Sequence, residues 1–103
     1  MDEPKLSLDE AKAIVATKTA PKITEASIKD HIDTVQYIDH NRLTICIITM
    51  YNGFDVVGVS KSASAANHDP EVGKRYAFDN AFKQLWQLEG YNLRTKLAEA
   101  GLN

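Results

Sequence analysis

Two stretches with the two-residue periodicity of a β-strand meet at Asn52-Gly53, and this arrangement restricts the chain to a small number of folds. Asn-Gly is the strongest short hairpin signal, because both residues tolerate the positive φ angles of a type I′ turn. A tight turn at His40-Asn41 separates the first of these stretches from an earlier one. The sequence therefore predicts three antiparallel strands, over residues 34–39, 42–51 and 54–61.

The middle strand is apolar on both of its faces, since successive side chains of a strand point in opposite directions. Its two faces carry Leu43, Ile45 and Ile47, and Cys46, Ile48 and Met50. Each face of the sheet therefore needs a cover. We expect a C-terminal helix to cover one face, and either the N-terminal helix or a second subunit to cover the other.

Helix-start signals precede the sheet. Residues 7–10, Ser-Leu-Asp-Glu, match a capping box and predict a first helix from Leu8 to about Lys18. Thr24 can cap a short second helix that ends near His31.

A longer helix follows the sheet. Asp69 provides a cap and Pro70 a first helical residue whose missing N–H costs nothing, which predicts a helix over residues 70–88. Gly90 can end that helix through a left-handed cap, so a final short helix is expected from residue 91 to about residue 100.

These elements predict an α+β fold in a single domain over residues 1–103. It comprises N-terminal helices (8–31), a three-stranded antiparallel β-meander (34–61) and C-terminal helices (70–100), one long and a final one short. A domain of 103 residues buries only about two-thirds of the surface of its unfolded chain, so oligomerisation would be a natural source of further stability.

Charge and composition exclude several classes of partner. The chain has twelve basic and fourteen acidic residues, and the resulting net charge of −2 argues against sequence-independent binding to duplex DNA. No apolar run has the character of a signal peptide or a membrane span, so no membrane partner is expected. The single cysteine, Cys46, lies in an apolar run and indicates a buried thiol in a reducing compartment. We expect a cytosolic protein.

The sequence offers no arrangement for catalysis or metal binding. His31, His40 and His68 lie on separate predicted elements, without a spacing that would place two of them on one helical face. The serines of residues 60–64 lie in no nucleophile-elbow pattern, and the scattered glycines form no phosphate loop. We therefore expect a binding protein and not an enzyme, with no cofactor and no metal.

The segment 67–91 combines a helix start, basic side chains, an interior amide and several rings, a mixture that suits a planar anionic small molecule. Arg75, like its neighbour Lys74, either meets a phosphate near the helix N-terminus or is simply solvated. Asn80 either clamps a neighbouring loop or strand, or reads the polar edge of a ligand. Tyr91 and Arg94 could lie at the rim of a pocket.

The order of these signals resembles that of a known family. They are Asn52-Gly53-Phe54, Gly58, Ser60, Asn67, Asp69, Gly73, Asn80-Ala81, Trp86 and Glu89-Gly90-Tyr91. The stretch from Val35 to Leu97 is similar to small bacteriophage and prophage proteins of the N4 gp49 and Sf6 gp66 type, a family that includes the Thoeris anti-defence type 1 proteins.

The resemblance implies a sponge in the cytoplasm of the host bacterium. Such a protein captures the cyclic ADP-ribose signal that TIR-domain enzymes make in Thoeris defence, and holds it without cleaving it. Some relatives also capture the cyclic oligonucleotides of CBASS defence, at separate sites of a homo-oligomer. The implied partners are therefore a cyclic nucleotide and further copies of the chain.

The resemblance also implies pockets between subunits, with site residues at matching positions. Asn80 would read polar groups, Phe54 and Tyr91 would contact a ring, and Arg75 and Arg94 would contact phosphates. Relatives tend to carry a phenylalanine where this chain has His68, whose imidazole stacks less strongly and has a pH-dependent charge.

Two other functions are compatible with the sequence. The protein could bind and inhibit a host protein, or assist phage assembly, through the apolar outer sheet face and an exposed C-terminal helix. It could also be a small hydrolase of such signals, in which case a recovered ligand would be altered.

Overall fold

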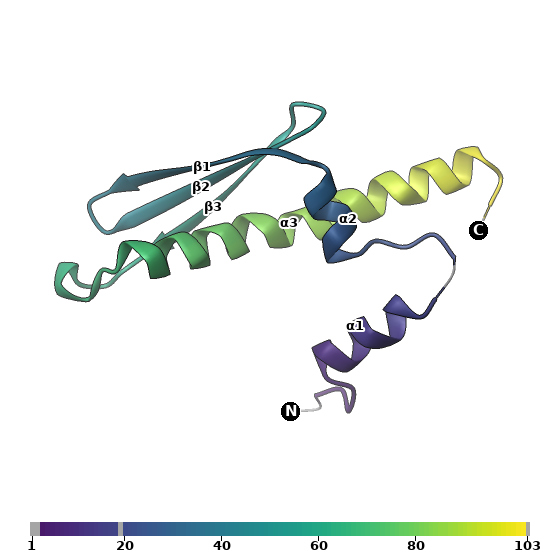
Figure 1. The fold of residues 1–103 in the computed structure, drawn as a ribbon, viewed down its shortest axis with the longest axis horizontal. Helices are drawn as coiled ribbons and strands as arrows, with labels where there is room; N and C mark the ends of the chain where they lie inside the picture. Colours follow the sequence, from purple (N-terminus) through teal and green to yellow (C-terminus); the bar gives the residue numbers. More distant parts are fainter. Residues whose placement is uncertain (1–2, 19, 103) are drawn as a thin grey trace.

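A computed structural model describes residues 3–18 and 20–102 of the chain. The elements, in chain order, are α1 (Leu8–Ala16), α2 (Glu25–Asp30), β1 (Ile32–His40), β2 (Leu43–Met50), β3 (Asp55–Lys61), a 3₁₀ turn η1 (Ala65–Asn67) and α3 (Pro70–Glu99). The three strands form one antiparallel sheet in the order β1-β2-β3, and α3 runs along it (Figure 1). The predicted α+β fold with a β-meander is confirmed.

Both turns of the meander differ in detail from the prediction. His40 pairs with Leu43, so the first turn consists of Asn41 and Arg42, one residue later than expected, and Asn41 adopts a left-handed φ of 54°. A left-handed residue is needed in such a tight turn, and asparagine tolerates that conformation.

The second turn is not type I′. Gly53 has a φ of 87°, whereas Asn52 does not share its positive φ. The Gly53 N–H donates to the Met50 carbonyl at 2.8 Å, and the Met50 N–H donates to the Phe54 carbonyl at 2.8 Å. These bonds close a three-residue loop, in which one left-handed residue is sufficient.

The helix α3 begins as predicted and ends later than predicted. Asp69 caps it by accepting from the N–H groups of Glu71 and Val72, with Pro70 as the first helical residue. It then continues through Gly90 as one helix of 30 residues, so the predicted break and the separate final helix are wrong. A glycine inside a helix costs only about 1 kcal/mol relative to alanine, which the good helix formers on either side outweigh.

The end of α3 lies at Gly101. Gly101 has a φ of 73°, its N–H donates to the Ala98 carbonyl, and the N–H of Leu102 donates to the Leu97 carbonyl at 2.8 Å. These two bonds form a Schellman motif, which satisfies carbonyls that a helix end leaves without partners.

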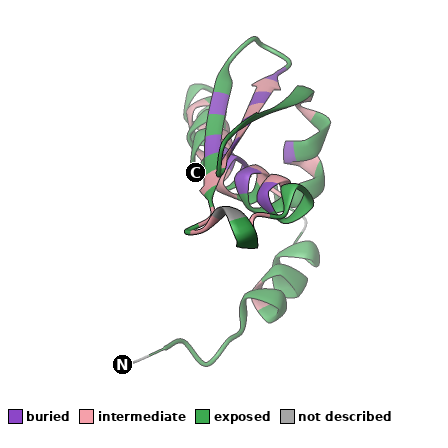
Figure 2. Cartoon of the chain, turned by 90° about the vertical axis from the view of Figure 1, so that its left-hand side faces the viewer, coloured by how far each residue is buried: buried purple, intermediate pink, exposed green. Residues whose placement is uncertain are grey.

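The core lies between α3 and one face of the sheet (Figure 2). On β2 the buried positions alternate, so this face consists of Thr44, Cys46, Ile48 and Met50. The buried side chains that pack against this face include Ile28, Ala77, Ala81, Phe82 and Leu85. The C-terminal helix therefore covers one face of the sheet, as expected.

The N-terminal helix does not cover the other face. Ser7 and Glu10 form the predicted capping box, but α1 ends at Ala16, contains no buried residue and stands apart from the sheet (Figure 1). The helix α2 is capped by Thr24 as predicted and contributes the buried Ile28 to the core. The N-terminal helix was therefore the wrong cover for the second face, and the alternative, a second subunit, stays a prediction.

Candidate ligand-binding site

The predicted site residues on α3 are spread along its length. Arg75 and Tyr91 are sixteen residues apart on one continuous helix, which places them about 24 Å apart along its axis. Arg94 lies almost one turn further on. A single copy of the chain therefore does not gather these residues around one small ligand.

Asn80 is a clamp between α3 and the outer strand β3. Its Nδ2 donates to the Val59 carbonyl at 2.9 Å. One turn later, Gln84 Nε2 donates to the Val57 carbonyl at 2.7 Å. The two amides satisfy carbonyls on the outer edge of the sheet, which would otherwise be open to another strand. Gln84 was not predicted, although its four-residue spacing from Asn80 places it on the same side of the helix.

Arg75 has partners within its own helix. Its guanidinium forms an ion pair with Asp79 and lies 5.1 Å from the centre of the Phe78 ring. The side chains of Arg75 and Asp79 are both more than half exposed, at 62% and 55%. An exposed ion pair contributes little stability, so Arg75 is able to exchange Asp79 for the phosphate of a ligand at small cost.

The other two polar candidates also have local contacts. His68 is half-buried, and its Nδ1 lies 3.1 Å from the Ser62 hydroxyl. Arg94 donates from Nη2 to the Leu102 carbonyl at 3.0 Å, and so supports the end of α3. Tyr91, by contrast, is 78% exposed and is available for a contact with another molecule.

Phe54 lies at a pocket between the β2–β3 loop and α3, which we call the hairpin pocket. Its volume is about 320 Å³, and it is lined by Met50, Tyr51, Asn52, Phe54, Leu85, Leu88, Glu89, Asn92 and Lys96. The lining combines aliphatic side chains, two aromatic rings, two amides, one cation (Lys96) and one carboxylate (Glu89). The rings and amides suit a planar ring that carries polar groups, and Lys96 offers a contact for a negative charge.

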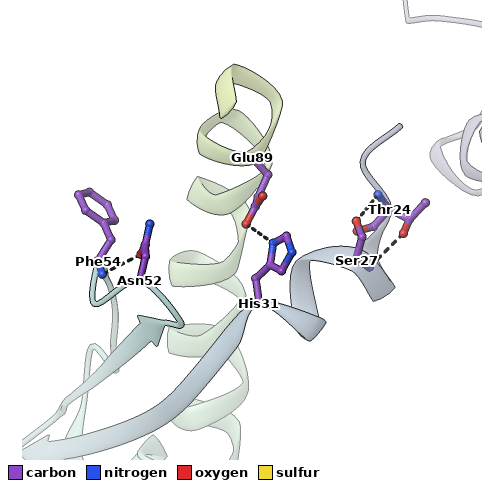
Figure 3. A network of polar contacts seen from close by, with 6 residues as sticks. All are labelled: Thr24, Ser27, His31, Asn52, Phe54 and Glu89. Carbon is purple, nitrogen blue, oxygen red and sulfur yellow. Dashed lines mark hydrogen bonds and ion pairs between the residues drawn. The ribbon is translucent and has the colours of Figure 1, made fainter. Parts of the chain in front are cut away.

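Short-range contacts hold the loop side of the hairpin pocket. The Phe54 N–H donates to Asn52 Oδ1 at 3.1 Å, and this bond positions the Phe54 backbone (Figure 3). Gly53 ends the turn with its left-handed φ. The exposed rings of Tyr51 and Phe54, at 62% and 55%, are therefore carried on an ordered loop.

A second contact ties this loop to the helix. His31 Nδ1 lies 2.9 Å from Glu89 Oε1 (Figure 3), and the His31 ring is 5.1 Å from the Tyr51 ring. The N–H of Tyr51 donates to the His31 carbonyl at 2.8 Å. The pocket therefore joins segments that are far apart in the sequence. Tyr51, Glu89, Asn92 and Lys96 were not predicted, although the last three have the helical spacing of one face.

A larger cavity lies between α1, α2 and Trp86. It has a volume of about 880 Å³ and a mainly aliphatic lining that includes Leu8, Val15 and Ile23, with Lys12 Nζ 6.0 Å from the Trp86 ring. Its polar lining residues are Lys12, Thr24, Glu25 and Lys29, and it contains none of the predicted site residues. The hairpin pocket is therefore the better candidate for a polar, planar molecule.

Metal-ligating and nucleophilic side chains are not gathered in the described part of the chain. Within residues 3–18 and 20–102, no cluster of three His, Cys, Asp or Glu side chains could hold a metal ion. Cys46 is fully buried, and burial raises the pKa of its thiol, which keeps it neutral and enclosed. Glu89 lines the hairpin pocket and contacts His31, which lies outside the lining, and the lining includes no serine, threonine or cysteine nucleophile.

The fold and the pocket define a small α+β protein with one sheet, one long covering helix and a pocket of ligand size at the hairpin. The chain belongs to the phage protein (N4 Gp49/phage Sf6 gene 66) family, whose model matches residues 19–97. The predicted family is confirmed, and α1 lies outside the matched range. No curated protein and no solved structure matches the chain. In the part of the chain that the structure describes, no helix has the length and apolar character to cross a membrane.

Proposed function

We propose that this phage protein is an anti-defence sponge. It binds a cyclic nucleotide immune signal, either a cyclic ADP-ribose isomer of Thoeris or a cyclic oligonucleotide of CBASS, and holds it uncleaved in the host cytoplasm. The observation that carries the proposal is the hairpin pocket, in which rings, amides and the Lys96 ammonium, together with the Glu89 carboxylate, line one cavity in a member of this family.

The pocket residues suit the parts of such a ligand. The rings of Tyr51 and Phe54 would contact a base, Asn52 and Asn92 would meet polar edges, and Lys96 would meet a phosphate. Base stacking contributes ~1 to 3 kcal/mol per base, whereas nanomolar affinity requires about 12 kcal/mol. Phosphate contacts and exclusion of water must therefore supply most of the binding free energy.

A second subunit would complete the site. A volume of about 320 Å³ lies at the lower end of the range for ligand pockets, roughly 300 to 1,000 Å³. The predicted residues Arg75, Tyr91 and Arg94 lie outside the pocket lining, at exposed positions of α3. In a homo-oligomer, a dimer or larger, a neighbouring copy can bring such residues to the pocket mouth.

The test is a thermal-shift screen of cyclic ADP-ribose isomers and cyclic di- and trinucleotides, followed by mass spectrometry of what is released on heating. A ligand at a hundred times its Kd should add about 2.7 kcal/mol of stability. The proposal requires that the released molecule is unchanged. If no nucleotide raises the Tm, the proposal fails, and an altered nucleotide would indicate a hydrolase instead.

Two substitutions assign the site. Phe54→Ala and Lys96→Gln should each weaken nucleotide binding at least about tenfold, because each removes a stacking or charged contact. Tyr76→Ala and Lys83→Gln are matched controls, since both residues are exposed on α3 outside the hairpin pocket. Equal effects of both pairs would show that the pocket is not the binding site.

A second candidate function is binding to a host protein, or a role in phage assembly. The observation that favours it is the sheet face opposite α3, which carries exposed aliphatic residues such as Val57 and Val59, at 46% and 41%. A pull-down from host lysate that yields one stoichiometric partner, together with no nucleotide effect, would support this function over the sponge.

A further inference from the structure

The face of the sheet opposite α3, which we call the open face, is apolar, and no described helix or strand covers it. Cross-strand partners in an antiparallel pair lie on the same face, so the strand register defines its residues. Its aliphatic members are Ile38, Leu43, Ile45, Ile47, Val57 and Val59, and none of them is buried. Figure 1 shows no element over this face. A contiguous apolar surface of this kind marks an interaction site.

The charges of the open face are arranged symmetrically. Among the strand residues of this face, Asp55 is the acid and Lys61 the lysine, and they lie at opposite ends of β3; His40 of β1 lies at the same end as Lys61. Each is three residues from Gly58, which pairs with Cys46 in the middle of the sheet, and Cys46 pairs with Tyr37 on β1. The middle of the face is therefore uncharged and its two ends have opposite charges.

We propose that the open face binds the open face of a second copy of this chain, about a two-fold axis that crosses the strands at the level of Gly58. This rotation reverses the strand direction. Asp55 of each copy then lies opposite Lys61 of the other, and the two ion pairs form together. Ile45 and Ile47 meet their counterparts in the centre, as do the valines of β3.

The geometry agrees with ordinary sheet packing. Two sheets pack face to face about 10 Å apart, with strand directions within about 30°, and aliphatic side chains interdigitate between them. The bond from Thr49 Oγ1 to Asp55 Oδ1, 2.6 Å long, holds the carboxylate on this face and uses only one of its oxygens. A two-fold axis along the strands would instead place β3 over β1, which carries no lysine, arginine or acid on this face.

The self-complementary charges favour a second copy over an unrelated protein. An isologous interface requires that a patch matches itself after a two-fold rotation, and a single acid and a single base equidistant from the axis meet that condition. The inference does not depend on the proposed function, because it concerns the protein without nucleotide. Each copy keeps α3 on the outer side of the pair, so a neighbour that completes the hairpin pocket would use a different contact.

The experiment is charge exchange in the full chain, read by sedimentation equilibrium and native mass spectrometry. Asp55→Lys leaves two cations on the face and Lys61→Asp leaves two anions, so each variant should raise the dimer dissociation constant about tenfold or more. A mixture of the two variants should form heterodimers with near wild-type affinity, because both ion pairs are then restored. The double variant D55K/K61D should dimerise like the wild type.

Matched controls carry the same charge changes elsewhere. Glu99→Lys and Lys83→Asp alter exposed residues of α3 and should leave the dissociation constant unchanged. Circular dichroism of the single variants reports whether the loss of the Thr49–Asp55 bond affects folding, and the mixture and the double variant test the pairing independently. A wild-type protein that stays monomeric, or single variants that dimerise normally, would overturn the proposal. Failure of the mixture to form heterodimers would overturn the proposed axis.

Discussion

Replacing Gly58 with alanine should strongly destabilise the protein, because this glycine is where the sheet touches α3. A Cβ at position 58 would lie 2.2 Å from the Ala77 carbonyl oxygen and 2.3 Å from the Ala81 nitrogen. Both atoms belong to the helix backbone, so no side-chain rotation relieves the contact.

The size of the effect follows from these distances. Real Cβ contacts are essentially never shorter than 3.0 Å, so the helix must withdraw by at least about 0.8 Å from a close-packed core. Overpacking of a core typically costs 1–3 kcal/mol and occasionally more. Since two backbone atoms of one helix are involved, we expect a loss of about 3 kcal/mol, from a total stability on the order of 5 to 15 kcal/mol.

The assay is urea denaturation at one fixed protein concentration, followed by circular dichroism. A loss of about 3 kcal/mol lowers the midpoint by roughly 1 to 3 M urea for a small domain. Gly90→Ala is the control, because a Cβ at position 90 meets nothing within 4 Å and the backbone is helical there. It should stabilise the protein by about 0.5–1 kcal/mol. A Gly58→Ala variant as stable as the wild type would refute the packing argument, and a loss in Gly90→Ala would refute the continuous helix.

Three further predictions test local features. Asn80→Ala should cost ~1 kcal/mol in urea denaturation through loss of its bond to the Val59 carbonyl, and no loss would show that the clamp is not formed in solution. Cys46 should not react with a thiol reagent in the native protein and should react fully in urea, because burial raises its pKa and encloses it; equal rates would contradict this. The bonds to Ser7 lower the pKa of the Glu10 carboxyl, so the cap of α1 is fully effective above pH 4.5 and is lost as the pH falls through the lowered pKa. The helical signal of α1 should therefore fall below pH 4.5, and a Ser7→Ala variant should lose that pH dependence.

Local signals predicted the elements well where a few neighbouring residues decide them. The caps at Ser7, Thr24 and Asp69 all form as expected, because each is a bond between a side chain and a backbone N–H two or three residues away. The predicted break at Gly90 was wrong for a similarly local reason. A helix ends where the helical backbone is no longer lower in free energy than the alternatives, and a single glycine costs too little to end a helix that is favourable on both sides.

The site could be predicted only in part. From the sequence, Asn80 could be either a clamp or a contact for a ligand. The clamp forms because the packing of α3 against β3 brings the Val59 carbonyl, twenty-one residues earlier in the sequence, within hydrogen-bond distance of the Asn80 side chain. Phe54 was identified, but its pocket partners on α3 were not. Their proximity depends on where the helix crosses the sheet, which no local pattern encodes.

By itself, the sequence determined which residues form strands and helices, where the helix caps lie and that both faces of the sheet are apolar. These properties follow from side-chain periodicity and from bonds within a few residues. The tertiary structure alone decided which face α3 covers, that α1 leaves the other face uncovered and that the hairpin and α3 enclose a pocket. The physical reason is that contacts between distant segments depend on the packing of whole surfaces, in which Gly58 sets the closest approach of helix and sheet.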